Sequence, residues 1–474
     1  MTATVTDTSK EAIRRIFDAQ RANQQAVAQT TARERIAKLR RLHKILMRYR
    51  QEIRDALYQD FRKPPTEVDL TEIYIITSEI KHTIRNLRRW MKPHHVATPL
   101  PLLGSRSYIQ YQPRGVVLII APWNFPVNLT FTPLVSAIAA GNCAVLKPSE
   151  NTPHSSAVMR RIVKEAFPEN EVALVEGAVE TSTTLLNLPF NHIFFTGSPA
   201  VGKIVMQAAA KHLASVTLEL GGKSPTIVDE TADIDKAAAR IAWGKHVNMG
   251  QTCIAPDYLL VHESRKEALL KKIEQHLKAS YSEDPQQSPD YPRIVNRKHF
   301  ERVRASLQDA LDGGARAIAG GQAEAAGRYI APTLVTDVDK DSRLMTEEIF
   351  GPVLPVIGFR NLQEAVDIVN SKEKPLALYL FSKNRNNIRQ VLNHTRAGTT
   401  CINNTLLQFN NHHLPFGGDN NSGIGKSHGW FGFEAFSNAR SVYKQVWPFS
   451  TADLLKPPYT AWKQKLADWT LRWL

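Results

Sequence analysis

A cysteine at position 253 stands beside glycine and proline in the segment Gly250-Gln-Thr-Cys-Ile-Ala-Pro256. A thiolate attacks carbonyl carbon readily, so this residue type is suited to covalent catalysis. A free cysteine is more often an inert buried residue, and the segment alone makes Cys253 no more than a candidate. Because 474 residues hold three cysteines, a disulfide framework is not expected. That cysteine usage fits a reducing, cytoplasmic location.

A glutamate at position 219 falls at the end of an apolar run, in Leu218-Glu-Leu-Gly-Gly-Lys223. Burial at a strand end would raise the pKa of this carboxyl group, because desolvation disfavours the charged form. A general base that works near neutral pH needs such a pKa. The competing interpretation is a surface glutamate near a glycine turn.

An asparagine at position 124 lies in Ala121-Pro-Trp-Asn-Phe-Pro126, directly after the apolar run 116–120. If that run is a parallel strand, Asn124 lies at the strand's carboxyl end, where open α/β sheets bind ligands. Its amide N–H groups can stabilise an oxyanion. A simple turn is the alternative, since Pro and Asn are both turn residues.

The elements that must position these residues follow from alternating apolar runs and helical stretches. A capping box at Thr31 and Glu34 opens a helical pattern that continues to Phe61, and Pro64 and Pro65 close it. Short buried strands are predicted at 116–120, 144–146, 172–175, 192–195 and 216–220, with helices between them. The alternation continues from 222 to about 403, including a strand at 258–261 and a helix at 265–281. We therefore predict two doubly wound α/β domains with parallel sheets.

Two segments depart from this alternation. The residues from Ser105 to Gln112 alternate in a way that predicts a strand outside the crossover series. A projecting hairpin there would favour pairing with a second subunit. The stretch 312–328 is polar and rich in Gly and Ala, which predicts a surface connection.

The net charge of +15 comes from basic residues that are spread over amphipathic segments. We find no zinc-finger spacing and no RNA-binding signature, so neither a metal site nor a nucleic-acid partner is expected. A solvated basic surface is the simpler explanation, and attraction to an anionic membrane is the alternative. No secretory signal and no membrane span are predicted.

The tail from 451 to 474 has its own pattern. Four apolar residues recur at helical spacing on one face that also carries basic residues: Trp462, Leu466, Trp469 and Trp473. Docking onto the body or onto a second subunit would explain this face. An interfacial helix in peripheral contact with a membrane would explain it as well.

Six motifs occur in order along the chain: APWNFP, CAVLKPSE, FFTGSPAVGK, LELGGKSP, GQTCIAPDY and EEIFGPVLPV. Together they resemble the aldehyde dehydrogenases, and the resemblance covers about residues 10 to 445. The later motif LPFGGDNNSGIGKSHG is similar to the class 3 branch, which includes fatty and aromatic aldehyde dehydrogenases.

The resemblance implies a Rossmann-like NAD(P)-binding domain from 1–89 and 112–219, and a catalytic domain from 220–403. It also implies a small β oligomerisation or bridging element from 90–111 and 404–450, and a homodimer. In the implied mechanism Cys253 forms a thiohemiacetal and then a thioester. Asn124 would hold the oxyanion, and Glu219 would activate the water that hydrolyses the thioester.

The resemblance also assigns cofactor-binding residues. Glu348 would hold the nicotinamide ribose with Phe350 nearby, and Lys147 and Glu150 would bind the adenosine ribose. The pyrophosphate would lie near the start of a helix in Gly197-Ser-Pro-Ala-Val-Gly202, with a contact from Ser198. A carboxylate at position 150 favours NAD over NADP, although class 3 relatives imply that NADP is accepted too.

The substrate is less defined. Trp243 matches a family position that can line the aldehyde channel, and Tyr74 and Phe409 are further candidates; core packing explains each equally well. An apolar channel suits medium- or long-chain aliphatic aldehydes, or aromatic ones. Lys426 and Ser427 depart from the small or aromatic residues expected there.

Three other functions remain open on the sequence: a Cys-dependent esterase or hydrolase, a catalytically silent binding protein of the same fold, and a CoA-acylating enzyme. The absence of a histidine motif beside Cys253 argues against the hydrolase. Retention of Glu219 favours hydrolysis of the thioester over its transfer to CoA.

Overall fold

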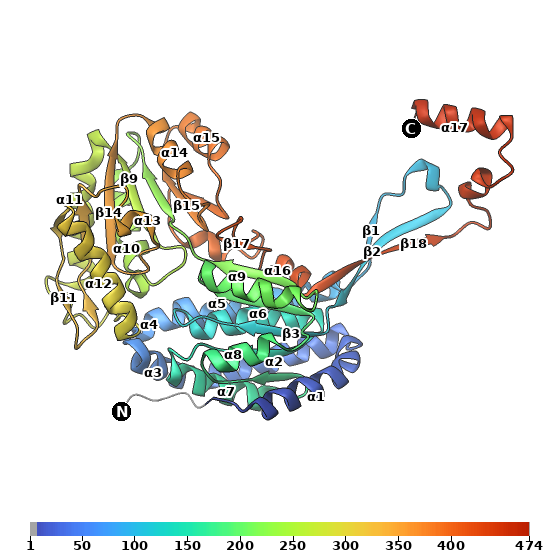
Figure 1. Ribbon diagram of the computed structural model, residues 1–474, viewed down its shortest axis with the longest axis horizontal. Helices are drawn as coiled ribbons and strands as arrows, with labels where there is room; N and C mark the ends of the chain where they lie inside the picture. The colour runs from blue at the N-terminus through green and yellow to red at the C-terminus, as the bar shows by residue number, and fades with distance from the viewer. Residues whose placement is uncertain (1–6, 474) are drawn as a thin grey trace.

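The computed structural model describes residues 7–473. Two α/β bodies lie side by side, and a long β arm projects from them (Figure 1). Each body contains a largely parallel sheet, which confirms the predicted fold class. The division into domains at the residue numbers given above stays a prediction.

The first sheet has the strand order β17-β7-β6-β3-β4-β5. Every strand except the short antiparallel β17 is parallel to its neighbours. The central strands β3 and β4 are buried along their whole length, because helices cover both faces of the sheet. Their apolar residues alternate between two separate cores, one on each face. The strands are β3 Val116–Ile120, β4 Cys143–Lys147, β5 Val172–Leu174, β6 His192–Gly197, β7 Ser215–Leu220 and β17 Gly423–Ile424.

The helices around this sheet come from the first 210 residues. They are α1 Lys10–Ala28, α2 Ala32–Arg48, α3 Arg50–Phe61, α4 Pro65–Val68, the π-helix η1 Asp69–Ile73, α5 Tyr74–Trp90, α6 Pro126–Ala140, α7 Pro153–Ala166, α8 Val179–Leu186 and α9 Pro199–Ala210. The capping box at Thr31 is present. The single helix predicted as far as Phe61 is wrong: Tyr49, with ψ of 5°, ends α2 and precedes α3.

The second sheet has the order β10-β13-β14-β9-β8-β15-β16. Its strands are β8 Pro225–Val228, β9 Tyr258–His262, β10 Arg316–Ala319, β13 Thr333–Thr336, β14 Val353–Phe359, β15 Ala377–Phe381 and β16 Thr399–Ile402. Its helices are α10 Ile234–His246, η3 Val247–Gly250, α11 Glu263–Tyr281, α12 Arg297–Asp312, α13 Arg343–Thr346, α14 Leu362–Asn370 and α15 Arg385–His394. The surface connection predicted from 312 to 328 instead contains the antiparallel edge strand β10 and the strand β11 Ala323–Glu324, which pairs with β12 Tyr329–Ile330.

The arm is a three-stranded antiparallel sheet of β1 His94–Val96, β2 Ser105–Pro113 and β18 Ser437–Gln445. The short helix η2 Leu100–Leu102 lies at its tip. The predicted strand outside the crossover series is β2. After β18 the chain forms η5 Thr451–Leu455 and α17 Ala461–Trp473, which lies at the far end of the arm, away from both bodies (Figure 1). Two further helices are η4 Leu407–Asn410, between β16 and β17, and α16 Gly429–Ala435, which directly precedes the arm strand β18.

Candidate active site

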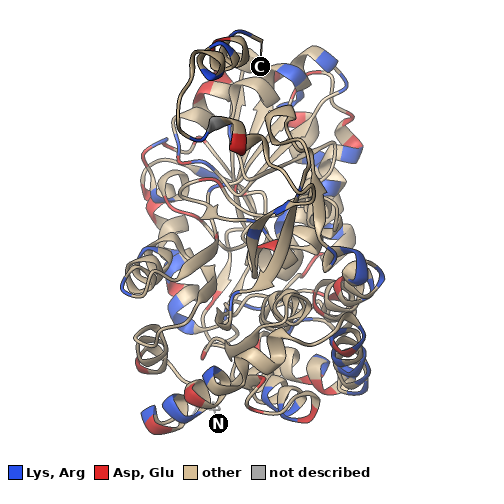
Figure 2. Ribbon diagram, turned by 90° about the vertical axis from the view of Figure 1, so that its right-hand side faces the viewer, with Lys and Arg blue, Asp and Glu red and all other residues tan. Residues whose placement is uncertain are grey.

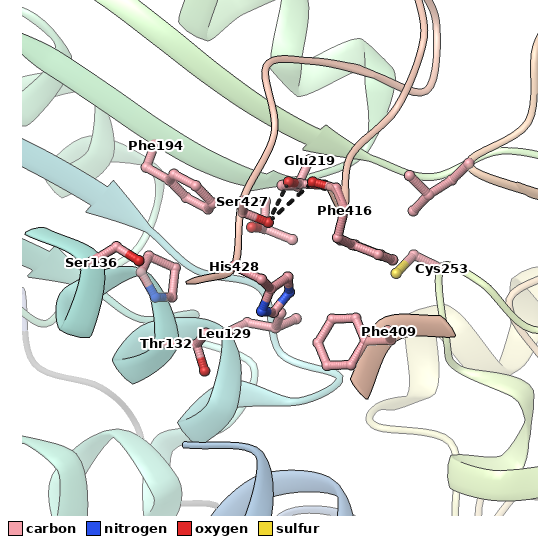
Figure 3. Close-up of a pocket in the computed structure, with 13 residues that line it drawn as sticks. Leu129, Thr132, Ser136, Phe194, Glu219, Cys253, Phe409, Phe416, Ser427 and His428 are labelled. Atoms are coloured by element: carbon pink, nitrogen blue, oxygen red, sulfur yellow. Dashed lines mark hydrogen bonds between the residues drawn. The ribbon is translucent and has the colours of Figure 1, made fainter. Parts of the chain in front are cut away.

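The three candidate catalytic residues come from different elements that meet between the two bodies. Asn124 follows β3, Glu219 lies near the end of β7, and Cys253 lies between η3 and β9. Two cavities meet here. A wide cleft of about 860 Å³ includes all three residues, and a narrow pocket of about 40 Å³ includes Cys253 and Glu219 (Figure 3). Four residues line both cavities: Leu129, Thr196, Glu219 and Cys253.

The loop before Cys253 has an unusual backbone. Asn248, Met249 and Gly250 have φ of 52°, 57° and 72°, so three consecutive residues are left-handed. Gly250 is required, because a Cβ atom there would lie 2.3 Å from the carbonyl oxygen of Gly351. Strain of this kind persists only where surrounding contacts enforce it. The loop thus holds the sulfur in a fixed position.

The Cys253 thiol is protonated at rest. Burial, together with the nearby carboxyl groups of Glu348 and Glu219, raises its pKa to about 12. Attack on a carbonyl therefore needs a base that takes the thiol proton.

Glu219 has the properties of that base. Its side chain is 6% exposed, and burial raises its pKa to about 7. The hydroxyl of Ser427 donates a hydrogen bond to Oε1 at 2.8 Å, and this bond and the charge of Lys426 oppose the effect of burial (Figure 3). The desolvated carboxyl group predicted from the sequence is confirmed.

Asn124 is buried and held at both ends. Its side-chain nitrogen donates to the carbonyl oxygen of Gln251 at 3.0 Å, which joins it to the loop that carries Cys253. Its own backbone carbonyl accepts from Lys63 Nζ at 3.2 Å and from Asn248 Nδ2 at 2.9 Å. One of the two side-chain N–H groups is engaged with Gln251, which leaves the other for an oxyanion.

A buried ion pair supports this arrangement, and the sequence analysis did not find it. Lys63 Nζ lies 3.1 Å from Glu72 Oε1, and both side chains are fully buried. The other oxygen of Glu72 accepts from the backbone N–H of Asn128 at 2.7 Å. Glu72 lies on η1, so the π-helix places a charge beneath the Asn124 loop. The sequence Lys63-Pro64-Pro65 predicts the end of a helix. It does not indicate that Lys63 forms an ion pair with Glu72.

The wide cleft contains most of the predicted cofactor residues. Gly197, Ser198, Glu348 and Phe350 line it. Ser198 caps α9, whose first backbone N–H groups lie at the edge of the cleft. Gly202 lies on α9 against Leu220 and does not itself line the cleft. A helix start beside a long cleft fits a dinucleotide pyrophosphate.

Lys147 is the last residue of β4, beside β3 in the sheet, and Glu150 follows three residues later; their side chains are 3.2 Å apart. Glu348 lies farther along the cleft, where Oε1 accepts from the backbone N–H of Gly222 at 3.1 Å. Burial and Asp257 raise the pKa of Glu348 to about 8. Glu348 thus places a carboxyl group in the cleft, whereas Lys147 and Glu150 are not among the described residues that line it.

The narrow pocket has a mainly apolar lining. Phe409 lines it, as predicted, together with Phe194, Phe416, Leu129 and Leu376. Ser427 and His428 also line this pocket. No catalytic or binding role was predicted for either residue from the sequence. The feature that could have identified them is the unexpected Lys426-Ser427 pair in the LPFGGDNNSGIGKSHG motif. Trp243 and Tyr74, 45% and 53% exposed, are not among the described residues that line the two cavities. Their place in a channel stays a prediction.

Residues 1–442 match the family model described as "Aldehyde dehydrogenase family". The 4,4'-diaponeurosporen-aldehyde dehydrogenase of Staphylococcus aureus (strain NCTC 8325 / PS 47) is 46% identical over 422 residues, 89% of this chain and 91% of the relative. Human aldehyde dehydrogenase family 3 member B1 is 44% identical over 407 residues, 86% of each protein. The predicted resemblance to the class 3 branch is confirmed.

Solved structures agree with this relationship. A substrate-bound structure of Staphylococcus aureus AldH has a TM-score of 0.93 and 42% identity, and covers 97% of this chain and 99% of that chain. An NAD+ complex of aldehyde dehydrogenase from Bacillus cereus has a TM-score of 0.85 and 29% identity, with 93% and 90% covered. This chain is therefore an aldehyde-oxidising enzyme and belongs to the aldehyde dehydrogenase family.

Proposed function

We propose that the enzyme converts aldehydes to carboxylic acids with NAD, through a thioester on Cys253 that water activated by Glu219 hydrolyses. The observation that supports this proposal is that the wide cleft and the narrow pocket have lining residues in common, which we call their shared wall. Because Cys253 and Glu219 line both, a bound aldehyde and a bound dinucleotide each reach the sulfur.

In the first half of the reaction, Glu219 takes the thiol proton and Cys253 bonds to the aldehyde carbon. The side-chain amide of Asn124 and the backbone N–H of Cys253 stabilise the oxyanion that forms. The nicotinamide, when bound, accepts the hydride that leaves this carbon. Cys253 then carries the acyl group as a thioester.

Before the second half, Glu219 releases the thiol proton to solvent. It then takes a proton from water while the water oxygen bonds to the acyl carbon, and later returns that proton to the Cys253 thiolate. The carbon–sulfur bond breaks, Cys253 leaves as thiolate, and the carboxylic acid is released. A base with a pKa near 7 suits this step, because it is ionised at neutral pH and still accepts a proton.

The wide cleft would hold the dinucleotide. Gly197 and Ser198 would face the pyrophosphate, and Glu348 and Phe350 would contact the nicotinamide ribose. Lys147 and Glu150 would bind the adenosine ribose, where a carboxylate repels a 2′-phosphate. We therefore propose NAD as the preferred cofactor, with NADP also accepted; the related Bacillus cereus enzyme was solved as an NAD+ complex.

The apolar lining of the narrow pocket supports medium- or long-chain aliphatic aldehydes, or aromatic ones, as substrates. A relative named for 4,4'-diaponeurosporen-aldehyde agrees with an apolar substrate. Trp243 and Tyr74 remain proposed channel residues nearer the surface.

We also propose a cytoplasmic homodimer that associates peripherally with membranes. The strand β18 lies at an edge of the arm sheet and supports pairing with a second subunit. In α17, Trp462, Trp469 and Trp473 are all more than half exposed, which supports an interfacial role. No helix among residues 7–473 is long and apolar enough to cross a bilayer.

A direct assay tests the proposed function. The purified protein is mixed with NAD and aldehydes of increasing chain length, and the absorbance of the reduced nicotinamide is followed. We expect turnover that rises with chain length and disappears in Cys253→Ala, with cofactor binding retained. An ester hydrolase or a silent binding protein would form no reduced nicotinamide, and full turnover in Cys253→Ala would reject the thioester.

A further inference from the structure

A buried carboxylate lies behind the narrow pocket and belongs to no step described so far. Glu79 on α5 is fully buried, and its Oε1 accepts from the backbone N–H of Gly429 at 2.9 Å. Its Oε2 lies 2.8 Å from His412 Nδ1 and 3.9 Å from His428 Nδ1. Burial alone would raise the pKa of Glu79, but the two imidazoles outweigh burial and lower it. Glu79 is therefore a fixed negative charge.

That charge holds a strained turn. His428 and Gly429 have φ of 70° and 52°, and the first of these costs energy for a residue with a side chain. A Cβ atom on Gly429 would lie 2.3 Å from the carbonyl oxygen of His412. Glu79 contacts both turn residues, through the backbone of Gly429 and the ring of His428. Its carboxylate thus stabilises a conformation that the segment would otherwise leave.

The same turn presents Ser427 to the general base. The Ser427 hydroxyl donates to Glu219 Oε1 at 2.8 Å (Figure 3), and the Ser427 backbone N–H donates to Phe416 at 2.7 Å. On the other side, Lys426 Nζ donates to the carbonyl oxygens of Gly417 and Gly418 at 2.6 and 3.0 Å. Ser427 is thereby fixed on both sides of its peptide.

We propose that Ser427 is a positioning residue for Glu219, and that Glu79 acts through the 427–429 turn to hold Ser427 in place. This inference rests on the proposed role of Glu219 as general base. The hydroxyl orients one carboxylate oxygen and leaves Oε2, which is buried and has no hydrogen-bond partner among the described residues, as the oxygen that takes the proton.

The proposal predicts a change in pH dependence. Glu219 faces the Cys253 thiol, the Lys426 ammonium and the His428 ring, as well as Ser427. A hydrogen bond donated to the ionised carboxylate favours that form, so removal of the hydroxyl raises the pKa of Glu219. The base then becomes ionised at a higher pH.

The experiment follows hydrolysis of the acyl-enzyme formed on Cys253 from p-nitrophenyl acetate, as a function of pH and without nicotinamide. In Ser427→Ala we expect slower hydrolysis near pH 7 and a midpoint higher by about 0.5 to 1 pH unit. Glu79→Gln should move the midpoint in the same direction. Ser427→Thr, which keeps a hydroxyl, should restore it.

The matched control is Ser156→Ala, which removes a buried hydroxyl that lines neither cavity and should leave the midpoint in place. Thermal unfolding checks that each variant folds. An unchanged midpoint in Ser427→Ala overturns the proposal, and an unchanged midpoint in Glu79→Gln overturns the part of Glu79. Glu219→Gln is measured in parallel: if it hydrolyses the acyl-enzyme normally, the proposed function itself fails.

Discussion

Glu219 combines a catalytic task with a cost to folding. A carboxyl group that must ionise inside an apolar pocket loses its hydration. The hydrogen bond from Ser427 and the charge of Lys426 compensate for this loss in part. The same burial that places its pKa near the working pH makes the folded state less stable once the group is charged. Catalysis and stability at this residue therefore respond to pH in opposite directions.

Glu219→Gln should abolish acyl-enzyme hydrolysis and stabilise the fold. Because the pKa is raised from 4.5 to about 7, the wild type loses stability as pH rises through this range. The loss is about 2 to 3 kcal/mol at pH 8 and under about 1 kcal/mol at pH 5. Unfolding of both proteins at the two pH values measures it. If the rate of acyl-enzyme hydrolysis in the wild type does not rise as pH increases through about 7, Glu219 is not the general base.

Asn124→Ala should lower kcat by about 100- to 1000-fold, since one oxyanion donor is lost. The dissociation constant for NAD should change little. Stopped-flow measurement of the first turnover tests this, because the oxyanion forms before the hydride leaves. A normal first turnover with slow later turnovers would assign Asn124 to another step.

The three proposed catalytic residues could be singled out in the sequence because each lies in a motif with a chemical reason of its own. Ser427 and His428 were not, because a serine or histidine has no distinctive chemistry until its neighbours are known. Glu219 and Ser427 are 208 positions apart and meet through the pairing of β17 with β7. The periodicity of apolar residues along the chain does not predict a contact between two side chains so far apart in the sequence.

At the scale of elements, the segment from Lys63 to Ile73 determines where Asn124 lies. A buried ion pair is costly to break, because the remaining charge has no water to solvate it. Here the pair joins the start of α6 to the loop after β3, through Asn128 and the Asn124 carbonyl. The π-helix η1 is the element that turns Glu72 toward this position.

Lys63→Met should destabilise the protein by about 3 to 5 kcal/mol and also reduce kcat. The double variant Lys63→Met with Glu72→Gln should recover much of the stability, since no unpaired charge remains. Thermal unfolding of the wild type, both single variants and the double variant completes the cycle. Equal stability of Lys63→Met and the double variant would show that the pair does not act as a unit.

Most elements were predictable, because buried parallel strands are short continuous apolar runs. The break at Tyr49 was not, since the apolar stripe continues from α2 into α3 without interruption. The edge strand β10 was missed for the opposite reason: its residues are mostly exposed, so its composition is that of a loop. The pattern of apolar residues indicates which residues are buried. It indicates neither the backbone break at Tyr49 nor an exposed strand such as β10.

At the scale of the whole molecule, the distribution of surface charge and the position of the arm determine which partner surfaces the enzyme can contact. Figure 2 shows Lys and Arg interspersed with Asp and Glu along the helices of both bodies in that view. The tail helix α17 extends beyond the arm, and none of residues 461–473 is buried. Its apolar face is thus available to a partner surface.

Truncation after Lys456 should abolish binding to anionic vesicles and reduce activity toward long-chain aldehydes. Activity toward a short, water-soluble aldehyde should stay the same, because α17 lies at the far end of the arm, away from both bodies in Figure 1. Vesicle sedimentation measures binding, and the full chain carrying Trp462→Ser, Trp469→Ser and Trp473→Ser is the matched variant, which should lose vesicle binding as the truncation does. Unchanged vesicle binding and long-chain activity would reject the membrane role.

The shared wall of the two cavities has a consequence for the order of events in one catalytic cycle. In the proposed function the dinucleotide would occupy the wide cleft and the carbon chain the narrow pocket, so neither would block the exit of the other. The spent cofactor would then be free to depart while the acyl group is still attached. The vacated volume would admit the water that Glu219 requires.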